Sequence, residues 1–149
     1  MNKPLTFIFL ISISCSTSLT YETETFKNYL YNTHNIALSE DKELFVILSN
    51  FSCLGCIEKT VEQMNQICQN NTITKLSIIT SHKDYLTQCL LENTTILYDS
   101  LALFDQMDIG IANATFIEAD KRKLNFVKSI ELPNIEHDVL KITKPYILN

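Results

Sequence analysis

The sequence predicts a single α/β domain, and three observations support this prediction. Short apolar runs alternate with amphipathic helical segments, which is the pattern of strands joined by crossover helices. Two apolar segments near the C-terminus bracket a charged turn, as in a β-hairpin. The chain has 149 residues, 46% of them hydrophobic, so it is long enough for one domain with a substantial core. We therefore expect an α/β sheet with flanking helices, closed by antiparallel strands.

The first fourteen residues have the pattern of an export signal. Lys3 supplies one cation, and the apolar stretch that begins at Leu5 is too short to span a bilayer, which needs about 20 residues. Cys15 follows directly after the small residue Ser14. The arrangement resembles a bacterial lipoprotein signal, which implies an acylated Cys15 as membrane anchor and a location in the periplasm or cell envelope. A simple signal peptide cleaved nearby and an apolar N-terminal strand are the alternatives.

Residues 15–35 are expected to form a tether and N-terminal segment ahead of the domain, which spans residues 36–149. The stretch 15–25 is rich in Ser, Thr and Glu and has little to bury, a composition that suits a tether. Residues 29–35 show no clear period.

Each element of the domain has its own signal. The continuous apolar run from Leu44 to Ser49 is typical of a strand buried on both faces. Apolar residues then recur at helical spacing from Ile57 to Cys68, and this helix is expected to end near Asn70. The other predicted elements are strands at 75–80 and 94–98, helices at 83–91, 101–107 and 135–142, and a hairpin of 114–119 and 124–130.

Charge and composition argue against several classes of function. Seventeen acidic residues against twelve basic ones give a net charge of -5, the wrong sign for binding nucleic-acid phosphates. Only two glycines occur, Gly55 and Gly110, so the glycine-rich nucleotide motifs are absent. The three histidines stand far apart, which argues against a His-based metal site. We expect no nucleic-acid partner, no metal and no cofactor.

The sequence Cys53-Leu54-Gly55-Cys56 carries the chemistry. It lies between the end of a predicted buried strand and the start of a predicted helix. A thiol at a helix N-terminus meets unpaired backbone N–H groups and the positive end of the helix dipole, so its pKa falls and the reactive thiolate is favoured. The two-residue gap brings the second sulfur within bonding distance of the first, so the pair can cycle between dithiol and disulfide.

From about Leu44 to Phe126 the chain resembles the thioredoxin superfamily, in particular its extracytoplasmic TlpA-like or redoxin branch. The order of strand, CxxC, helix, strand, helix, strand, helix and hairpin matches, and residues 95–99, TILYD, match that branch's third strand. The resemblance implies a thioredoxin-like sheet and a thiol-disulfide oxidoreductase. Its partners would be proteins with disulfides or thiols and an extracytoplasmic electron donor. Cys53 would be the attacking cysteine and Cys56 the resolving one.

The chain departs from the pattern of this family in three features. Ser52 stands where a tryptophan usually precedes the first cysteine. The cis-proline that faces the sulfur pair should fall near Asn113 or Ala114, where this chain has no proline. Lys121 and Arg122 occupy the hairpin turn, where the branch commonly has a glycine.

Three hypotheses for the function stay open at this stage. The first is the oxidoreductase. The second is a Cu(I) or soft-metal-binding protein, because an exposed CxxC outside the cytoplasm also suits that ion. The third is a non-catalytic binding module in which Cys53 and Cys56 form a structural disulfide. Cys68 and Cys89 lie on the apolar faces of their predicted helices, where we expect buried thiols, and a disulfide between them is the alternative.

Overall fold

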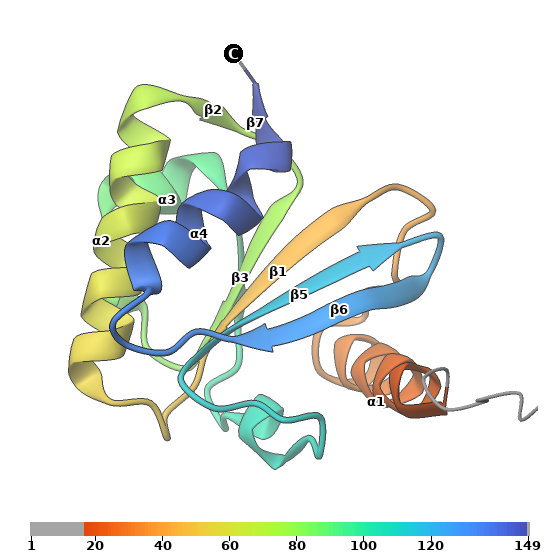
Figure 1. Ribbon diagram of the computed structural model, residues 1–149. Helices are drawn as coiled ribbons and strands as arrows, with labels where there is room; N and C mark the ends of the chain where they lie inside the picture. The colour runs from red at the N-terminus through yellow and green to blue at the C-terminus, as the bar shows by residue number, and fades with distance from the viewer. Residues whose placement is uncertain (1–16, 149) are drawn as a thin grey trace, which may run out of the picture.

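The structure, a computed structural model, describes residues 17–148 and has an α/β fold built on a mixed five-stranded sheet (Figure 1). The strand order is β4-β3-β1-β5-β6. β1, β3 and β4 run parallel, β5 is antiparallel to β1, and β6 is antiparallel to β5. The strands are β1 Glu43–Leu48, β3 Leu76–Thr80, β4 Thr95–Tyr98, β5 Ala114–Asp120 and β6 Lys123–Ser129. The predicted α/β class, with flanking helices and a closing hairpin, is confirmed.

Helices pack on both faces of this sheet. The α-helices are α1 Thr17–His34, α2 Leu54–Asn70, α3 Gln88–Asn93 and α4 Ile135–Thr143. The 3-10 helices are η1 Lys83–Tyr85, η2 Leu103–Gln106 and η3 Lys144–Tyr146. A second, antiparallel sheet consists of two short strands, β2 Thr72–Ile73 and β7 Ile147–Leu148.

Two separate cores explain why β1 is apolar from Leu44 to Leu48. Side chains alternate between the faces of a strand, so Leu44, Val46 and Leu48 enter one core while Phe45 and Ile47 enter the other. The first core is formed with α2, α3 and α4, and the second with α1 and η2. Figure 1 shows α2, α3 and α4 grouped on one side of the sheet and α1 on the other.

The strand order places α2 and α3 on the same face. The chain steps from β1 to β3 and then to β4, in one direction across the sheet. Connections between parallel strands are right-handed in nearly all proteins, so two crossovers in the same direction put their helices on one side. This arrangement brings the end of α2 toward α3.

Residues 17–34, part of the stretch 15–35 expected as tether and N-terminal segment, form the helix α1. Thr23, Phe26 and Leu30 lie along one narrow side of this helix and are buried against the sheet. The Thr23 hydroxyl accepts a 3.1 Å hydrogen bond from the backbone N–H of Leu124, which ties α1 to β6. Only a few apolar side chains of α1 are needed for this contact. The segment therefore has a polar composition like that of a tether, although it packs as part of the domain.

The helix predicted at 83–91 is two shorter elements, η1 and α3, because the backbone is extended at Leu86 and Thr87. The predicted helix at 101–107 is the 3-10 helix η2. The helix predicted at 135–142 is confirmed as α4. The β2–β7 pair was not predicted, since two residues are too few to produce a periodic pattern. The predicted signal at residues 1–14 and the anchor Cys15 lie outside the described residues.

Candidate functional site

Cys53 is the N-cap residue of α2, the position that the sequence predicts for it. Its backbone is extended, with φ -63° and ψ 133°, and its Sγ accepts a 3.1 Å hydrogen bond from the backbone N–H of Cys56. The same N–H and that of Ile57 also point to the Cys53 carbonyl oxygen, at 2.9 and 3.2 Å. The sulfur therefore lies at the helix end where backbone N–H groups and the helix dipole stabilise negative charge.

Cys53 and Cys56 form a disulfide, but the two residues differ in accessibility. The sulfur atoms lie 2.20 Å apart and the Cα atoms 5.3 Å apart. Cys53 is exposed, whereas Cys56 is only 4% exposed and packs into the core beneath α2. Thiol exchange requires direct access of the attacking sulfur, so a partner protein can reach Cys53 and not Cys56.

The loop that connects β1 to Cys53 is held by hydrogen bonds from distant segments. Ser49 Oγ donates to Asp105 Oδ1 at 2.6 Å, and the Asn50 N–H donates to Asp105 Oδ2 at 3.1 Å. Ser81 Oγ donates to the Asn50 side-chain oxygen at 2.6 Å. The Ser52 hydroxyl, next to Cys53, is the one buried side-chain oxygen or nitrogen between residues 17 and 148 without a hydrogen-bond partner.

Sequence reasoning did not find Ser49 and Asp105. The two residues are 56 positions apart and belong to no motif. Only the strand order, which carries η2 to the end of β1, brings them together.

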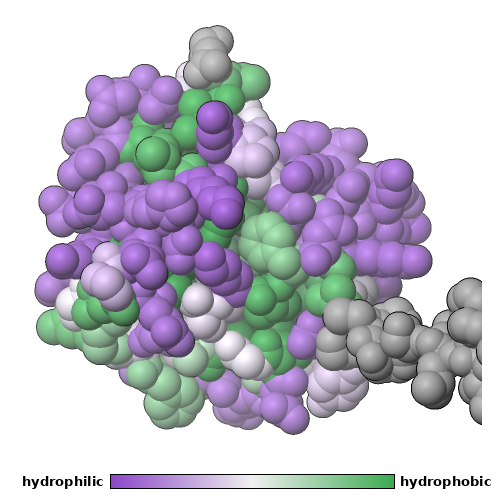
Figure 2. Space-filling view, in the orientation of Figure 1, coloured by the Kyte–Doolittle hydropathy of each residue, from purple (hydrophilic) through white to green (hydrophobic). Residues whose placement is uncertain are grey.

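Two exposed apolar side chains lie close to Cys53 in the sequence. Phe51 is 79% exposed and Leu54 is 54% exposed. Figure 2 shows apolar surface at the lower left of the molecule, where α2 begins. A hollow of about 280 Å³ lies beside these residues and is lined by Leu48, Asn50, Ser52, Leu54, Ile57, Thr80, His82 and Tyr85. Apolar side chains gathered at the surface are typical of sites that contact other proteins.

Asn113 and Ala114 lie at the same edge of the sheet as the cysteine pair, since Ala114 pairs with Leu48 at the end of β1. Asn113 has a left-handed backbone with φ 54°. Hydroxyl groups hold the preceding loop: Ser129 Oγ donates to the Gly110 carbonyl at 3.0 Å, and Thr115 Oγ1 donates to the Ala112 carbonyl at 2.9 Å. The segment without proline is therefore fixed by side-chain hydrogen bonds.

Cys68 and Cys89 form a second disulfide, so the expectation of two buried thiols is wrong. The sulfur atoms are 2.07 Å apart and the Cα atoms 6.2 Å apart. Cys68 lies in the last turn of α2 and Cys89 near the start of α3. The bond forms because consecutive right-handed crossovers place both helices on one face, which the sequence alone did not establish. It lies at the end of α2 opposite to Cys53.

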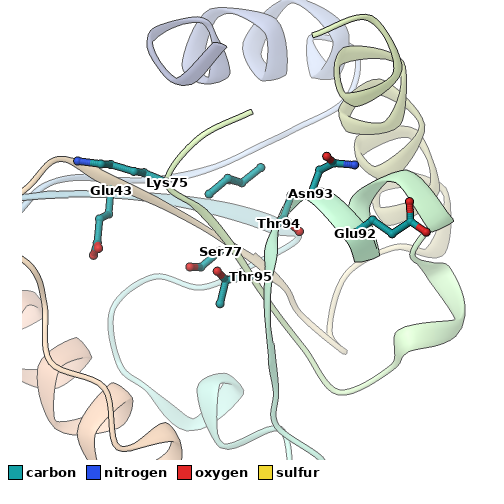
Figure 3. A pocket seen from close by; sticks show the side chains of 8 residues that line it. Glu43, Lys75, Ser77, Glu92, Asn93, Thr94 and Thr95 are labelled. Atoms are coloured by element: carbon teal, nitrogen blue, oxygen red, sulfur yellow. The ribbon is translucent and has the colours of Figure 1, made fainter. Parts of the chain in front are cut away.

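A second hollow, of about 360 Å³, is remote from the cysteine pair (Figure 3). It lies where the parallel strands begin, the opposite edge from Cys53. Ser77 and Thr95 pair across β3 and β4 in its centre, while Lys75 and Glu92 extend away from each other. Lys75 binds Asp41 at 2.8 Å. None of the residues that line this hollow is a cysteine, so it is separate from the candidate site at Cys53 and Cys56.

No protein-family model, curated protein or solved structure matches the chain. Among residues 17–148, no helix has the length and apolar character needed to cross a membrane. Within the same residues, no group of three or more His, Cys, Asp or Glu side chains is placed to hold a metal ion.

Proposed function

We propose that the chain is an extracytoplasmic thiol-disulfide oxidoreductase of the thioredoxin superfamily that acts on partner proteins. The observation that carries this proposal is the asymmetry of the cysteine pair. Cys53 is exposed at the N-cap of α2, and the Cys56 to which it is bonded is buried. One sulfur can thus exchange with a partner, and the other is placed to close the disulfide again.

The fold supports this assignment. The CxxC segment follows β1, the central strand of the order β4-β3-β1-β5-β6, and α2 begins directly at the pair. This topology, with a closing antiparallel hairpin and helices on both faces, is compatible with a thioredoxin-like fold.

The proposed thiol-disulfide exchange needs only the two cysteines and a dithiol donor. In the reducing direction, the Cys53 thiolate attacks one sulfur of a substrate disulfide, forms a mixed disulfide and releases the other substrate sulfur as a thiolate. The Cys56 thiolate then attacks Cys53 Sγ, closes the Cys53–Cys56 disulfide and releases the second substrate thiolate. Two electrons pass to the substrate, and an extracytoplasmic dithiol donor returns them. The same steps in reverse oxidise a substrate dithiol.

The proposed location is the periplasm or cell envelope of a bacterium, with Cys15 as the lipid anchor. The Cys68–Cys89 disulfide supports an oxidising compartment, because such bonds are rare in the reducing cytosol. If Cys15 is the acylation point, Cys15→Ala should abolish the processed, membrane-bound form. A fully processed and membrane-bound Cys15→Ala protein would exclude the anchor.

Trapping of mixed disulfides tests the proposed activity. Cys56→Ser keeps the attacking thiol and removes the resolving one, so it should accumulate adducts between Cys53 and substrate proteins in the native compartment. Cys53→Ser is the matched control and should trap far fewer. Bound Cu(I) that is lost from both variants, without adducts, would support a soft-metal binder. A loss of stability alone would support a structural disulfide. Absence of adducts, together with a wild type that cannot reduce a model disulfide, would overturn the oxidoreductase proposal.

A further inference from the structure

The side-chain carboxylate of Asp105 holds the loop between β1 and Cys53. Both oxygens of Asp105 are used: Oδ1 accepts from Ser49 Oγ at 2.6 Å, and Oδ2 accepts from the Asn50 N–H at 3.1 Å. Ser49 is fully buried and Asp105 is half-buried. Hydrogen bonds to a carboxylate are shorter and stronger than those between neutral groups, so this is the strongest hydrogen-bonded contact of the loop.

Ser49 connects Asp105 to the next part of the loop by hydrogen bonds. The Ser49 hydroxyl gives its one hydrogen to Asp105, which leaves its lone pairs for other donors. The Phe51 N–H donates to Ser49 Oγ at 3.1 Å, and the Ser52 N–H donates to the Ser49 carbonyl at 3.2 Å. Ser49 and Asn50 thus bond directly to Asp105, Phe51 is linked to it through the Ser49 hydroxyl, and the Ser52 N–H is held by the Ser49 backbone. The next residue is Cys53.

The segment that carries Asp105 is itself rigidly held. Its neighbour Phe104 is fully buried in the core formed with α1. The Phe104 N–H donates to Asp99 Oδ2 at 3.1 Å, and the Leu101 N–H donates to Asp99 Oδ1 at 3.2 Å. The Tyr29 hydroxyl also donates to Asp99 Oδ2, at 3.2 Å. Asp105 therefore connects the core on the α1 face to the loop that enters α2 on the opposite face.

We propose that Asp105 is a positioning residue that fixes Cys53 at the N-cap of α2, where the helix end stabilises its thiolate. The proposal rests on the proposed function, in which Cys53 is the attacking thiol. The N-cap stabilises a thiolate only while the sulfur stays aligned with the first backbone N–H groups of the helix, and here that group is the Cys56 N–H. A loosened loop lets the sulfur leave this alignment.

A purely electrostatic role for Asp105 predicts the opposite sign. A nearby negative charge disfavours a thiolate, so removing the carboxylate would lower the Cys53 pKa if its charge were the main effect. If its hydrogen bonds to the loop are the main effect, removal raises the pKa of Cys53 toward that of a free cysteine. The direction of the change in pKa therefore separates the two roles.

The test uses the full chain in its reduced form, and measures the rate at which iodoacetamide alkylates Cys53 as a function of pH, by mass spectrometry of the Cys53 peptide. Asp105→Ala should raise the Cys53 pKa by ~0.5, which lowers the alkylation rate by about threefold at pH values well below that pKa. Ser49→Ala should act in the same direction, since it removes the hydroxyl that links Asp105 to Phe51. Asp108→Ala is the matched control, because Asp108 is exposed and lies three positions away. It should leave the profile unchanged.

An unchanged profile in Asp105→Ala, or a Cys53 pKa that falls in both Asp105→Ala and the isosteric Asp105→Asn, would overturn the proposal. If Asp105→Ala does not fold, as judged by circular dichroism, Ser49→Ala and Asp105→Asn decide the question. Reduction of a model disulfide by the wild type is measured in parallel. Its failure, together with the absence of trapped adducts in Cys56→Ser, would refute the oxidoreductase, while the alkylation profile would still decide whether Asp105 positions Cys53.

Discussion

The Tyr146 hydroxyl donates a 2.8 Å hydrogen bond to Oε2 of Glu118, and this contact ties the C-terminal segment to β5 of the sheet. Lys42 Nζ lies 2.9 Å from the same oxygen, and Asn125 donates to Oε1 at 3.0 Å. Burial alone would raise the pKa of Glu118, but the hydrogen bonds from Asn125, Lys42 and Tyr146 outweigh it and lower the pKa below its ordinary value of 4.5. Glu118 is thus an ionised group that stabilises the fold.

This lowered pKa predicts a specific acid sensitivity. The carboxylate contributes its full stabilisation above pH 4.5, and the contribution is lost as the pH falls through the lowered pKa. Glu118→Gln should lose about 1–2 kcal/mol at pH 7, since a neutral amide cannot accept all three hydrogen bonds. The difference from wild type should shrink below pH 4, measured by urea unfolding. The exposed Glu131→Gln is the control, and an equal loss in both variants would contradict the prediction.

The second disulfide should contribute to stability independently of the first. Cys68 and Cys89 are 21 positions apart, and closing a loop of that size stabilises a fold by about 3 kcal/mol in the chain-entropy model. The double variant Cys68→Ala/Cys89→Ala should lose about this much free energy of unfolding in urea. Because the bond lies at the far end of α2, alkylation of Cys53 should keep its pH profile. A changed profile would show that the two ends are coupled.

The exposed side chains Phe51 and Leu54 should matter for protein substrates. Burying one such side chain against a partner contributes about 1.5 kcal/mol or more, so Phe51→Ser or Leu54→Ser should raise the KM for a protein disulfide about tenfold. Oxidised glutathione is too small to cover these residues, and its rate should change little. Leu140→Ser is the control, because Leu140 is 56% exposed on α4. Equal effects on both substrates would exclude a docking role.

Introducing a proline at Asn113 should destabilise the protein. Proline requires a φ near -65°, whereas Asn113 has φ 54°. Asn113→Pro should therefore lose more than about 1 kcal/mol in thermal unfolding. Asn113→Gly is the matched variant, since glycine adopts positive φ without strain, and it should unfold near the wild-type temperature. A stable and more active Asn113→Pro protein would mean that the loop rearranges to accept a proline.

Local pattern was sufficient to predict β1, α2 and the hairpin. The apolar run from Leu44 to Leu48 is typical of a strand buried on both faces, and this strand is β1. The helical spacing of apolar residues from Ile57 to Cys68 defines the buried side of α2. The pattern failed for α1, where burial of only a few side chains such as Phe26 and Leu30 holds an otherwise polar helix.

Contacts between distant segments could not be predicted in the same way. The bond between Cys68 and Cys89 depends on the direction in which successive strands are added to the sheet, and the sequence does not state that direction. The contact between Ser49 and Asp105 likewise depends on where η2 lies after β4. The cysteine pair could be located from sequence because its spacing and its place between strand and helix are both local.

The two disulfides also determine how α2 can open. Cys53 is exposed at the start of the helix, next to a first turn with free solvent on one side, while Cys68 bonds the last turn covalently to α3. Fraying of α2 that begins at Leu54 therefore stops before the last turn, which is bonded to α3, and the opening stays local. We expect amide hydrogens of the first turn to exchange with solvent much faster than those near Cys68. The first turn of α2, beside Cys53, would then be the mobile end of the helix, and the last turn, at Cys68, the rigid end.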